Sequence, residues 1–385
     1  MDRKQQVLGK LRETDGYLSG QQLCEALGIS RTAVWKIVGK LKQEGYPIEA
    51  VTNKGYRLLS VEGKDLLNQE ELDRAMHTAW VGKPLIYREE TGSTNTDLFK
   101  LSEEGASQGT IEVTSKQTAG KGRRGRTWIS PPDVNVYMSI LLTPAIRPDT
   151  APMLTLVMAM AVYEACEELY GDAETEANGG ADLKSAQNTD LKSAQNTDRK
   201  SAQNAAGEPA HEEAREPDHA LRFGIKWPND IVVSADGGPF KKICGILTEM
   251  RLEEMEIRDI VIGIGLNVNQ TEFPEEIQET AGSLRLALGK TVNRAQLTAA
   301  VWKHFEEDYE VFLKAQSLEP LRERYEKGLV NRKRKVRVLD PASPFEGTAI
   351  GINSQGELIV RMDDGSPDRA IGTGEVSVRG VMGYV

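Results

Sequence analysis

The sequence predicts an α+β fold of several domains, and three observations carry this prediction. The chain has 385 residues, which is more than one ordinary domain needs. Its first 60 residues contain three short helical patterns followed by a hairpin pattern. Strand and helix patterns then alternate as far as residue 269. With 39% hydrophobic and 28% charged residues, the chain has the composition of folded domains and not of a disordered protein.

The first domain, residues 1–62, is predicted to be a winged helix-turn-helix. Ser19 and Ser30 can cap its second and third helices, and Asn53-Lys54-Gly55 suits the turn of its hairpin. In this fold the third helix enters the major groove of DNA. The predicted elements are helices over 3–15, 20–27 and 30–44 and a hairpin over 46–59.

Charge supports DNA binding only in this domain. The whole chain carries a net charge of −10, whereas residues 1–60 hold ten Lys or Arg against six Asp or Glu. A small protein-interaction domain is the alternative, and we favour DNA because the polar face of the third helix is cationic. The sequence does not decide whether Trp35 is buried. The candidate DNA-binding residues are Ser30, Arg31, Thr32, Lys36, Lys40 and Lys54.

Residues 63–82 are predicted to be a linker and residues 83–330 a central domain. Its strands and helices mix in the order typical of an α+β core with a mainly antiparallel sheet. The predicted strands are 85–88, 111–115, 135–142, 223–226, 231–234, 244–250 and 259–269. The predicted helices are 96–104 and 153–170.

Residues 171–220 are predicted to be a disordered insertion in the central domain. The sequence Asp-Leu-Lys-Ser-Ala-Gln-Asn-Thr stands at 182–189 and again at 190–197. The insertion lacks Phe, Trp, Tyr, Val, Ile and Met, so it cannot bury a core. We assign it no function.

The last domain, residues 331–385, is predicted to be a small SH3-like β barrel. Short apolar stretches alternate there with turn sequences such as Asp363-Asp364-Gly365. The predicted strands are 335–339, 347–352, 358–362 and 375–378.

The sequence contains no pattern that predicts export or a membrane span. The N-terminus lacks the apolar core of a signal peptide, and the uncharged run at 151–163 is shorter than the roughly 20 residues that a spanning helix needs. Cys24, Cys166 and Cys244 are scattered, without the spacing of a disulfide framework or a zinc site. We therefore expect a cytoplasmic protein that does not bind membranes.

The segment Gly120-Lys121-Gly122-Arg123-Arg124-Gly125-Arg126-Thr127-Trp128 carries the clearest chemistry. It matches GxGxxG, but the dinucleotide-binding fingerprint must open a helix, and Pro131-Pro132 follows too closely for that. Glycines let backbone N–H groups approach an anion, and the four cations can neutralise phosphate. A solvated basic loop is the alternative. We favour a phosphate-binding loop, because the cations repel one another unless an anion gathers them.

This loop resembles the GRGRRGRxW loop of biotin–protein ligases, with Lys121 where arginine is usual. Lysine keeps the charge but loses the bidentate geometry of arginine. The resemblance covers about residues 85–270 and implies a class II synthetase-like fold. The flanking domains resemble those of the longer, bifunctional ligase/repressor type. The other matching segments are Gly92-Ser93-Thr94-Asn95 with Gln117, Lys226-Trp227-Pro228-Asn229-Asp230, 242–247 and 263–269.

The resemblance implies an ATP-dependent ligase. Such an enzyme forms biotinyl-5′-AMP from biotin and ATP, releases pyrophosphate, and transfers biotin to a lysine of biotin carboxyl carrier protein. The biotin carboxylate and the α-phosphate are both anions, so cations that offset their repulsion would supply most of the catalysis. We expect Mg²⁺ on the triphosphate with few protein ligands, and we single out no residue as a metal ligand.

The resemblance also assigns roles to residues. Ser93, Thr94 and Asn95 can instead cap the helix that follows, Trp128 can stack on adenine or pack in the core, and Asp230 can orient Lys226 or cap a turn. The predicted catalytic residues are Lys226, Arg123 and Arg124. The predicted biotin-binding residues are Ser93, Thr94, Asn95, Gln117, Gly120, Lys121, Gly122, Arg123 and Lys226. The predicted adenylate-binding residues are Lys121, Arg123, Arg124, Arg126, Trp128 and Asn267.

A second activity implied by the resemblance is repression of biotin genes, with biotinyl-5′-AMP as the corepressor. Ordering of the basic loop would favour a homodimer that binds palindromic operator DNA. One alternative is a biotin-sensing transcription factor without ligase activity, which would lack Lys226 or the phosphate-binding loop. The other is a lipoate–protein ligase, whose Ser-Gly-Gly-Gly loop is absent here. The sequence favours the ligase.

Overall fold

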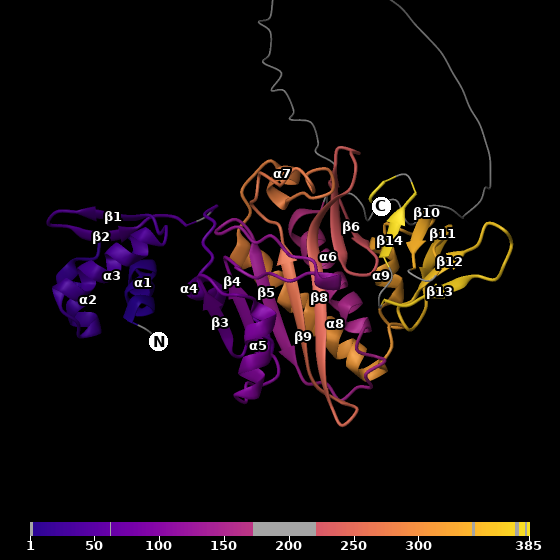
Figure 1. Cartoon of the computed structure of the whole chain (residues 1–385). Coiled ribbons are helices and arrows are strands. Elements are labelled where there is room, and N and C mark those ends of the chain that lie inside the picture. The colour runs from indigo at the N-terminus through magenta and orange to yellow at the C-terminus, as the bar shows by residue number, and fades with distance from the viewer. Residues whose placement is uncertain (1–2, 62, 172–220, 341–342, 374–376, 382) are drawn as a thin grey trace, which may run out of the picture.

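The computed structural model describes residues 3–61, 63–171, 221–340, 343–373, 377–381 and 383–385. The predicted insertion at 171–220 lies outside the described residues except for Gly171. Figure 1 shows three units in a row: a helical unit with a hairpin, a sheet covered by helices, and a smaller sheet. Within the described part of the chain, no helix has the length and apolar composition to cross a membrane.

The N-terminal unit has the predicted order of helices and hairpin. Ser19 caps α2 and Ser30 caps α3, as predicted. The unit has a hydrophobic core of its own, to which Leu23 and Val38 belong and to which Leu66 of the linker also contributes. The elements are α1 (Arg3–Glu13), α2 (Gly20–Leu27), α3 (Arg31–Gln43), β1 (Ile48–Val51) and β2 (Gly55–Leu58).

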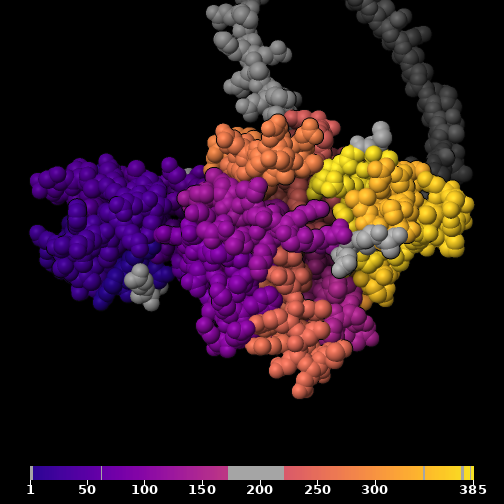
Figure 2. Space-filling view, in the orientation of Figure 1, coloured from indigo at the N-terminus to yellow at the C-terminus, as the bar shows by residue number. Residues whose placement is uncertain are grey.

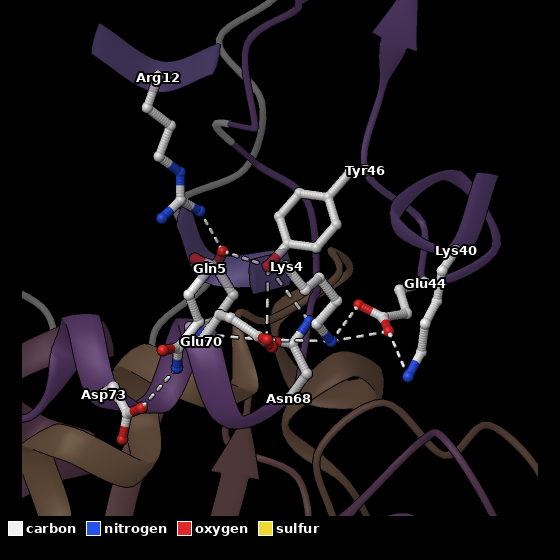
Figure 3. Close-up of polar contacts among 10 residues, drawn as sticks. Lys4, Gln5, Arg12, Lys40, Glu44, Tyr46, Asn68, Glu70 and Asp73 are labelled. Atoms are coloured by element: carbon white, nitrogen blue, oxygen red, sulfur yellow. Dashed lines mark hydrogen bonds and ion pairs between the residues drawn. The ribbon is translucent and has the colours of Figure 1, made fainter. Parts of the chain in front are cut away.

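A short helix, α4 (Gln69–Ala75), joins this unit to the rest of the chain. Figure 3 shows the polar contacts between the N-terminal unit and the α4 region. Glu71 of α4 is 5% exposed. It accepts hydrogen bonds from the Tyr46 hydroxyl over 2.8 Å and from Arg12. Glu70, also buried, pairs with Lys4 of α1 over 2.9 Å. The N-terminal unit is therefore attached through buried charges that have partners.

The linker is equally well attached on its other side. α4 packs against α8 (Arg294–Ala315) and β3 (Leu85–Arg88). Asp65 accepts hydrogen bonds from Arg294 Nε and from Asn269 Nδ2, each over 2.7 Å. The linker thus contacts the N-terminal unit through one face and the central domain through the other.

The central domain is built on a seven-stranded sheet with the order β3-β4-β5-β9-β8-β7-β6. β3 and β4 are parallel and the other neighbours are antiparallel, so the mainly antiparallel sheet is confirmed. α5 (Thr94–Glu103) covers one face, and α6 (Met153–Tyr170) with α8 covers the other. The strands are β3 (Leu85–Arg88), β4 (Ile111–Thr114), β5 (Val136–Leu142), β6 (Leu221–Lys226), β7 (Asp230–Ala235), β8 (Lys241–Glu253) and β9 (Glu256–Leu266).

The central domain differs from the prediction in where two strands end and in three helices that were not predicted. β9 ends at Leu266, so 267–269, predicted as strand, lie beyond it. β8 extends to Glu253, three residues past its predicted end, and a tight turn joins it to β9. Besides α8, the helices α7 (Leu284–Leu288) and α9 (Arg322–Gly328) were not predicted.

The C-terminal unit is a five-stranded antiparallel sheet with the order β13-β12-β11-β10-β14. Four strands were predicted, and β13 was missed. In the part of the chain that the structure describes, β13 and β14 are the two edges and no ladder closes the sheet into a barrel. The strands are β10 (Lys335–Leu339), β11 (Phe345–Ile352), β12 (Leu358–Arg361), β13 (Arg369–Ile371) and β14 (Ser377–Gly380).

The C-terminal unit shares the hydrophobic core of the central domain. Val336 and Val360 belong to the same cluster of buried residues as Ile225 and Trp227 of the central domain. The Trp227 indole donates a hydrogen bond to the carbonyl of Gly356 over 3.0 Å. Figure 2 shows the two units directly against each other.

Candidate active site

Most of the residues predicted to bind biotin or the adenylate line one cavity. It lies between the N-terminal end of α5, the glycine-rich loop at 120–128, and the middle of the sheet at β8 and β9. The lining residues are Ser93, Thr94, Asn95, Gln117, Lys121, Gly122, Arg123, Trp128, Asn229, Lys242, Gly245, Ile246, Leu247, Gly263, Ile264 and Gly265.

One end of the cavity is polar and held by a chain of hydrogen bonds. Thr94 Oγ1 lies 2.6 Å from Ser139 Oγ, which donates to Asn95 Oδ1 over 2.6 Å. Asn95 Nδ2 donates to Glu249 over 2.7 Å, and Gln117 Oε1 accepts from the amide of Thr94 over 3.1 Å. Buried polar groups with satisfied partners are rigid, so this end can present fixed donors and acceptors to a polar ring.

A capping role was predicted for at least one of Ser93, Thr94 and Asn95, and the structure agrees with it in position but not in hydrogen bonding. Ser93 occupies the N-cap position of α5, but its side chain makes no capping hydrogen bond. Thr94 and Asn95 lie within the helix, and it is Gln117 that accepts from a free amide at the helix start. These side chains therefore contribute to the cavity and not to the helix end.

The floor of the cavity is apolar and depends on glycines. The Trp128 ring lies against β8 and β9, where a Cβ at Gly245 would stand 2.8 Å from it and one at Gly265 closer still. Only glycine leaves room for the indole there. The buried Trp128 Nε1 has no hydrogen-bond partner among the described residues.

Arg123 is held in place within the glycine-rich loop. It donates from Nη1 to Asn229 Oδ1 over 2.8 Å and from Nη2 to the carbonyl of Thr373 over 2.7 Å. Burial lowers the pKa of Arg123, and the nearby Asp230 opposes that shift. The exposed Arg124 has a left-handed backbone with φ 60°, which is uncommon for a residue with a side chain.

A second group of charges lies beside the cavity. Lys242 Nζ is 2.6 Å from Asp230 Oδ1, and Lys226 Nζ is 3.7 Å from Asp230 Oδ2. Burial raises the pKa of Asp230, but the two lysines outweigh it and lower that pKa to about 2. Burial also lowers the pKa of Lys226, which is 6% exposed. Asp230 is therefore ionised at neutral pH and lies between two cations.

The cavity contains a lysine that the sequence analysis missed. Lys242 lines it, whereas Lys226, the predicted catalytic lysine, does not. The available signal was a lysine two residues before the predicted strand 244–250, in a segment used only for its family resemblance. Asn267 is buried and donates to the carbonyl of Gly282 over 3.1 Å. The predicted residues outside the lining are Gly120, Arg124, Arg126, Lys226 and Asn267.

The predicted DNA-binding residues are all exposed, on α3, at its N-cap and on the hairpin. The side chain of Ser30 is used in capping α3, and Arg31 donates to Gln21 over 2.9 Å. Trp35, which the sequence left undecided, is 67% exposed on the same helix. Together these residues form an open, cationic face.

Three family profiles match consecutive parts of the chain. The HTH domain profile matches residues 3–57. The Biotin/lipoate A/B protein ligase family profile matches residues 87–267, and the profile of the Biotin protein ligase C terminal domain matches residues 334–379.

Named relatives match nearly the whole chain. The bifunctional ligase/repressor BirA of Bacillus subtilis (strain 168) is 34% identical over 351 residues, which cover 91% of this chain and 90% of that protein. The bifunctional ligase/repressor BirA of Escherichia coli (strain K12) is 28% identical and covers 90% of this chain and 88% of its own. A solved structure, the biotin protein ligase from Aquifex aeolicus in complex with biotin and ATP, has a TM-score of 0.55 and 28% identity, and covers 77% of this chain and 99% of that one.

Proposed function

Since this chain belongs to the family of bifunctional biotin ligase/repressors, we propose that the cavity between α5 and the glycine-rich loop makes biotinyl-5′-AMP from biotin and ATP. The chain is a biotin–protein ligase that transfers the biotin to a lysine of biotin carboxyl carrier protein. One observation carries the assignment to this cavity. Rigid amides lie at one end, and Arg123 and Lys242 also line it, which suits a ligand with a polar ring and a carboxylate.

We assign the ureido ring of biotin to the end formed by Ser93, Thr94, Asn95 and Gln117. The donors and acceptors of that ring need fixed partners once they are buried, and the chain of hydrogen bonds that ends at Glu249 supplies them. We assign Trp128 and Asn267 to the adenylate, Trp128 because its ring lines the cavity, with Lys242 Nζ 5.2 Å from the ring centroid. We assign Gly120, Lys121 and Gly122 to a loop that closes over the bound molecule.

In the first step, a carboxylate oxygen of biotin attacks the α-phosphorus of ATP. The bond from that phosphorus to the bridging oxygen breaks, and pyrophosphate leaves. Arg123 and Lys242 offset the charge that collects between the two anions, and the exposed Arg124 and Arg126 are placed to meet the leaving pyrophosphate. Lys226, the catalytic lysine that the sequence predicted, lies beside Asp230, and we propose that its positive charge helps to offset the same negative charge.

We expect ATP to arrive as its Mg²⁺ complex, so the metal is part of the substrate. Mg²⁺ keeps several waters and needs few protein ligands when phosphates hold it. In the second step, the neutral amine of the acceptor lysine attacks the carbonyl carbon of the adenylate, and AMP leaves. A mixed anhydride is already activated, so this step needs no nucleophile from the ligase.

Biotin-dependent exchange of pyrophosphate into ATP tests the proposal. We expect purified protein to exchange label with biotin and not with lipoate. Exchange with lipoate alone would show a lipoate–protein ligase. A folded protein without exchange on either acid would point to a biotin-sensing transcription factor that lacks ligase activity, or to a different carboxylate substrate.

The finer parts of the prediction remain proposals. The chain is a repressor that binds DNA through its helix-turn-helix, and we propose that it does so as a homodimer on the operators of biotin genes in the cytoplasm. The exposed loop around Arg124 supports this, because a loop that orders on biotinyl-5′-AMP can change the surface offered to a partner. We also keep the SH3-like assignment of the last domain, which its five antiparallel strands support, and the predicted boundaries 1–62, 63–82, 83–330 and 331–385.

A further inference from the structure

The C-terminal segment reaches the charged group beside the cavity. The hydroxyl of Tyr384 donates a hydrogen bond to Asp230 Oδ2 over 2.7 Å. The ring of the same tyrosine lies under Lys226, whose Nζ is 4.4 Å from the ring centroid. Tyr384 thus contacts both Asp230 and Lys226, although more than 150 residues separate it from them.

The fold holds this segment against the sheet. β14 pairs with β10, and a bridge between Gly380 and Gly383 turns the chain back toward it. A side chain at Gly380 would collide with the backbone of Val385, so glycine is needed at this close approach. The position of Tyr384 is therefore set by the C-terminal sheet.

The contacts of Asp230 divide between its two oxygens. Oδ1 forms an ion pair with Lys242. Oδ2 accepts the hydrogen bond from the Tyr384 hydroxyl and lies 3.7 Å from Lys226 Nζ. Without the hydroxyl, the carboxylate could turn toward either lysine. With it, Oδ2 is held on the side of Tyr384, and Oδ1 faces Lys242, the lysine that lines the cavity.

We propose that Tyr384 is a positioning residue for adenylation. Its hydrogen bond fixes the rotation of the Asp230 carboxylate, which in turn orients the ammonium of Lys242 toward the reacting phosphate. The C-terminal unit also touches the phosphate-binding loop, because the carbonyl of Thr373 accepts from Arg123. The C-terminal unit therefore completes the site. This inference rests on the proposed ligase function.

The first test compares Tyr384→Phe with wild type in the pyrophosphate exchange assay. We expect kcat to fall about ten-fold, the size of one lost hydrogen bond to a charged group. The KM for biotin should stay within about two-fold, because the ureido end of the cavity is untouched. Tyr325→Phe is the matched control. Tyr325 is also buried, and its hydroxyl has no hydrogen-bond partner within the described residues, so its loss should leave both constants unchanged.

The second test asks whether Tyr384 acts through Asp230. In an Asp230→Ala background the acceptor of the Tyr384 hydroxyl is gone, so adding Tyr384→Phe should cost little more than Asp230→Ala alone. Losses that multiply in the double variant would overturn the positioning role, as would a Tyr384→Phe protein with wild-type kcat. A Tyr384→Phe protein that loses kcat and melts much earlier than wild type would also count against it. A wild-type protein without biotin-dependent exchange would instead remove the proposed function and this inference with it.

Discussion

At the scale of single residues, most of the residues predicted to bind biotin or the adenylate line one cavity, but the sequence did not identify every side chain that lines it. Lys226 and Lys242 both stand in segments that resemble the family, and alternation along a strand should tell which one faces the cavity. Here it does not, because the pairing of β7 with β8 shifts register between Ile231 and Val232. A bulge of this kind redirects the side chains after it, so the lining lysine could be identified only from the structure.

This difference gives a prediction for two matched variants. Lys242→Met and Lys226→Met each keep an unbranched chain and remove one charge. We expect Lys242→Met to lower kcat for pyrophosphate exchange by about a hundred-fold or more, as the loss of a group that stabilises a charged transition state does. Lys226→Met should lower it less, because that lysine lies outside the cavity lining. The opposite order would return the catalytic role to Lys226.

At the scale of elements, periodic patterns predicted most of the fold. All seven strands of the central sheet and both of its predicted helices are present, since each has a clear apolar period. β13 was missed because three residues with one buried position carry no alternation. The helix α8 was missed although its buried residues recur at helical spacing, namely Leu297, Val301, Phe305, Tyr309 and Phe312. The helical spacing was present in the sequence, but no helix was predicted there. Contacts between distant segments, such as Glu71 with Tyr46, carry no local signal.

α4 leads to a prediction about how the N-terminal unit is held. Glu71→Gln would remove the charge that Arg12, Arg74 and Tyr46 contact, with an expected loss of about 2 kcal/mol for hydrogen bonds to a buried charge. Because the N-terminal unit has its own core, we expect it to melt separately in calorimetry, and its transition should fall by roughly 10 °C.

The exposed Glu25, on α2 of the same unit, provides the control. Glu25→Gln should leave the melting curve unchanged.

The contacts of Glu71 in the wild-type protein should persist at neutral pH. Burial raises the pKa of Glu71, but its partners outweigh that and lower it, so its contribution is present above the ordinary glutamate pKa and is lost only as the pH falls through the lowered value. A Glu71→Gln protein that melts like wild type would mean that other contacts hold the unit.

At the scale of the whole molecule, two large hydrophobic cores serve the three predicted domains, beside a small cluster of Leu98, Leu141 and Val261 under α5. The N-terminal core is separate, while the central and C-terminal units share one cluster of buried residues. The sequence predicted the three segments but could not predict this shared packing, because the residues that meet are far apart in the chain. The helix-turn-helix therefore has a core of its own, and the linker joins it to the part of the chain that carries the cavity.

This arrangement predicts how ligand and DNA binding combine. We expect the protein to shift DNA from upstream of biotin genes at least ten-fold more strongly with biotin and ATP than without them, because the adenylate would favour the proposed dimer. Arg31→Ala should lose this binding and keep pyrophosphate exchange, since Arg31 lies on the exposed face of α3. DNA binding of equal strength with and without biotin and ATP would contradict the corepressor role.

The shared core also determines what a truncation of the C-terminal sheet would do. Trp227, the neighbour of Lys226, is buried and bonded to Gly356 of the C-terminal sheet. A nonsense mutation before β10 would strip away that cover and expose the ring together with the apolar residues around it. Such an allele would lose all five strands of the C-terminal sheet, and we expect it to lose both activities. Alleles that separate repression from biotinylation should instead be sought as missense changes on α3.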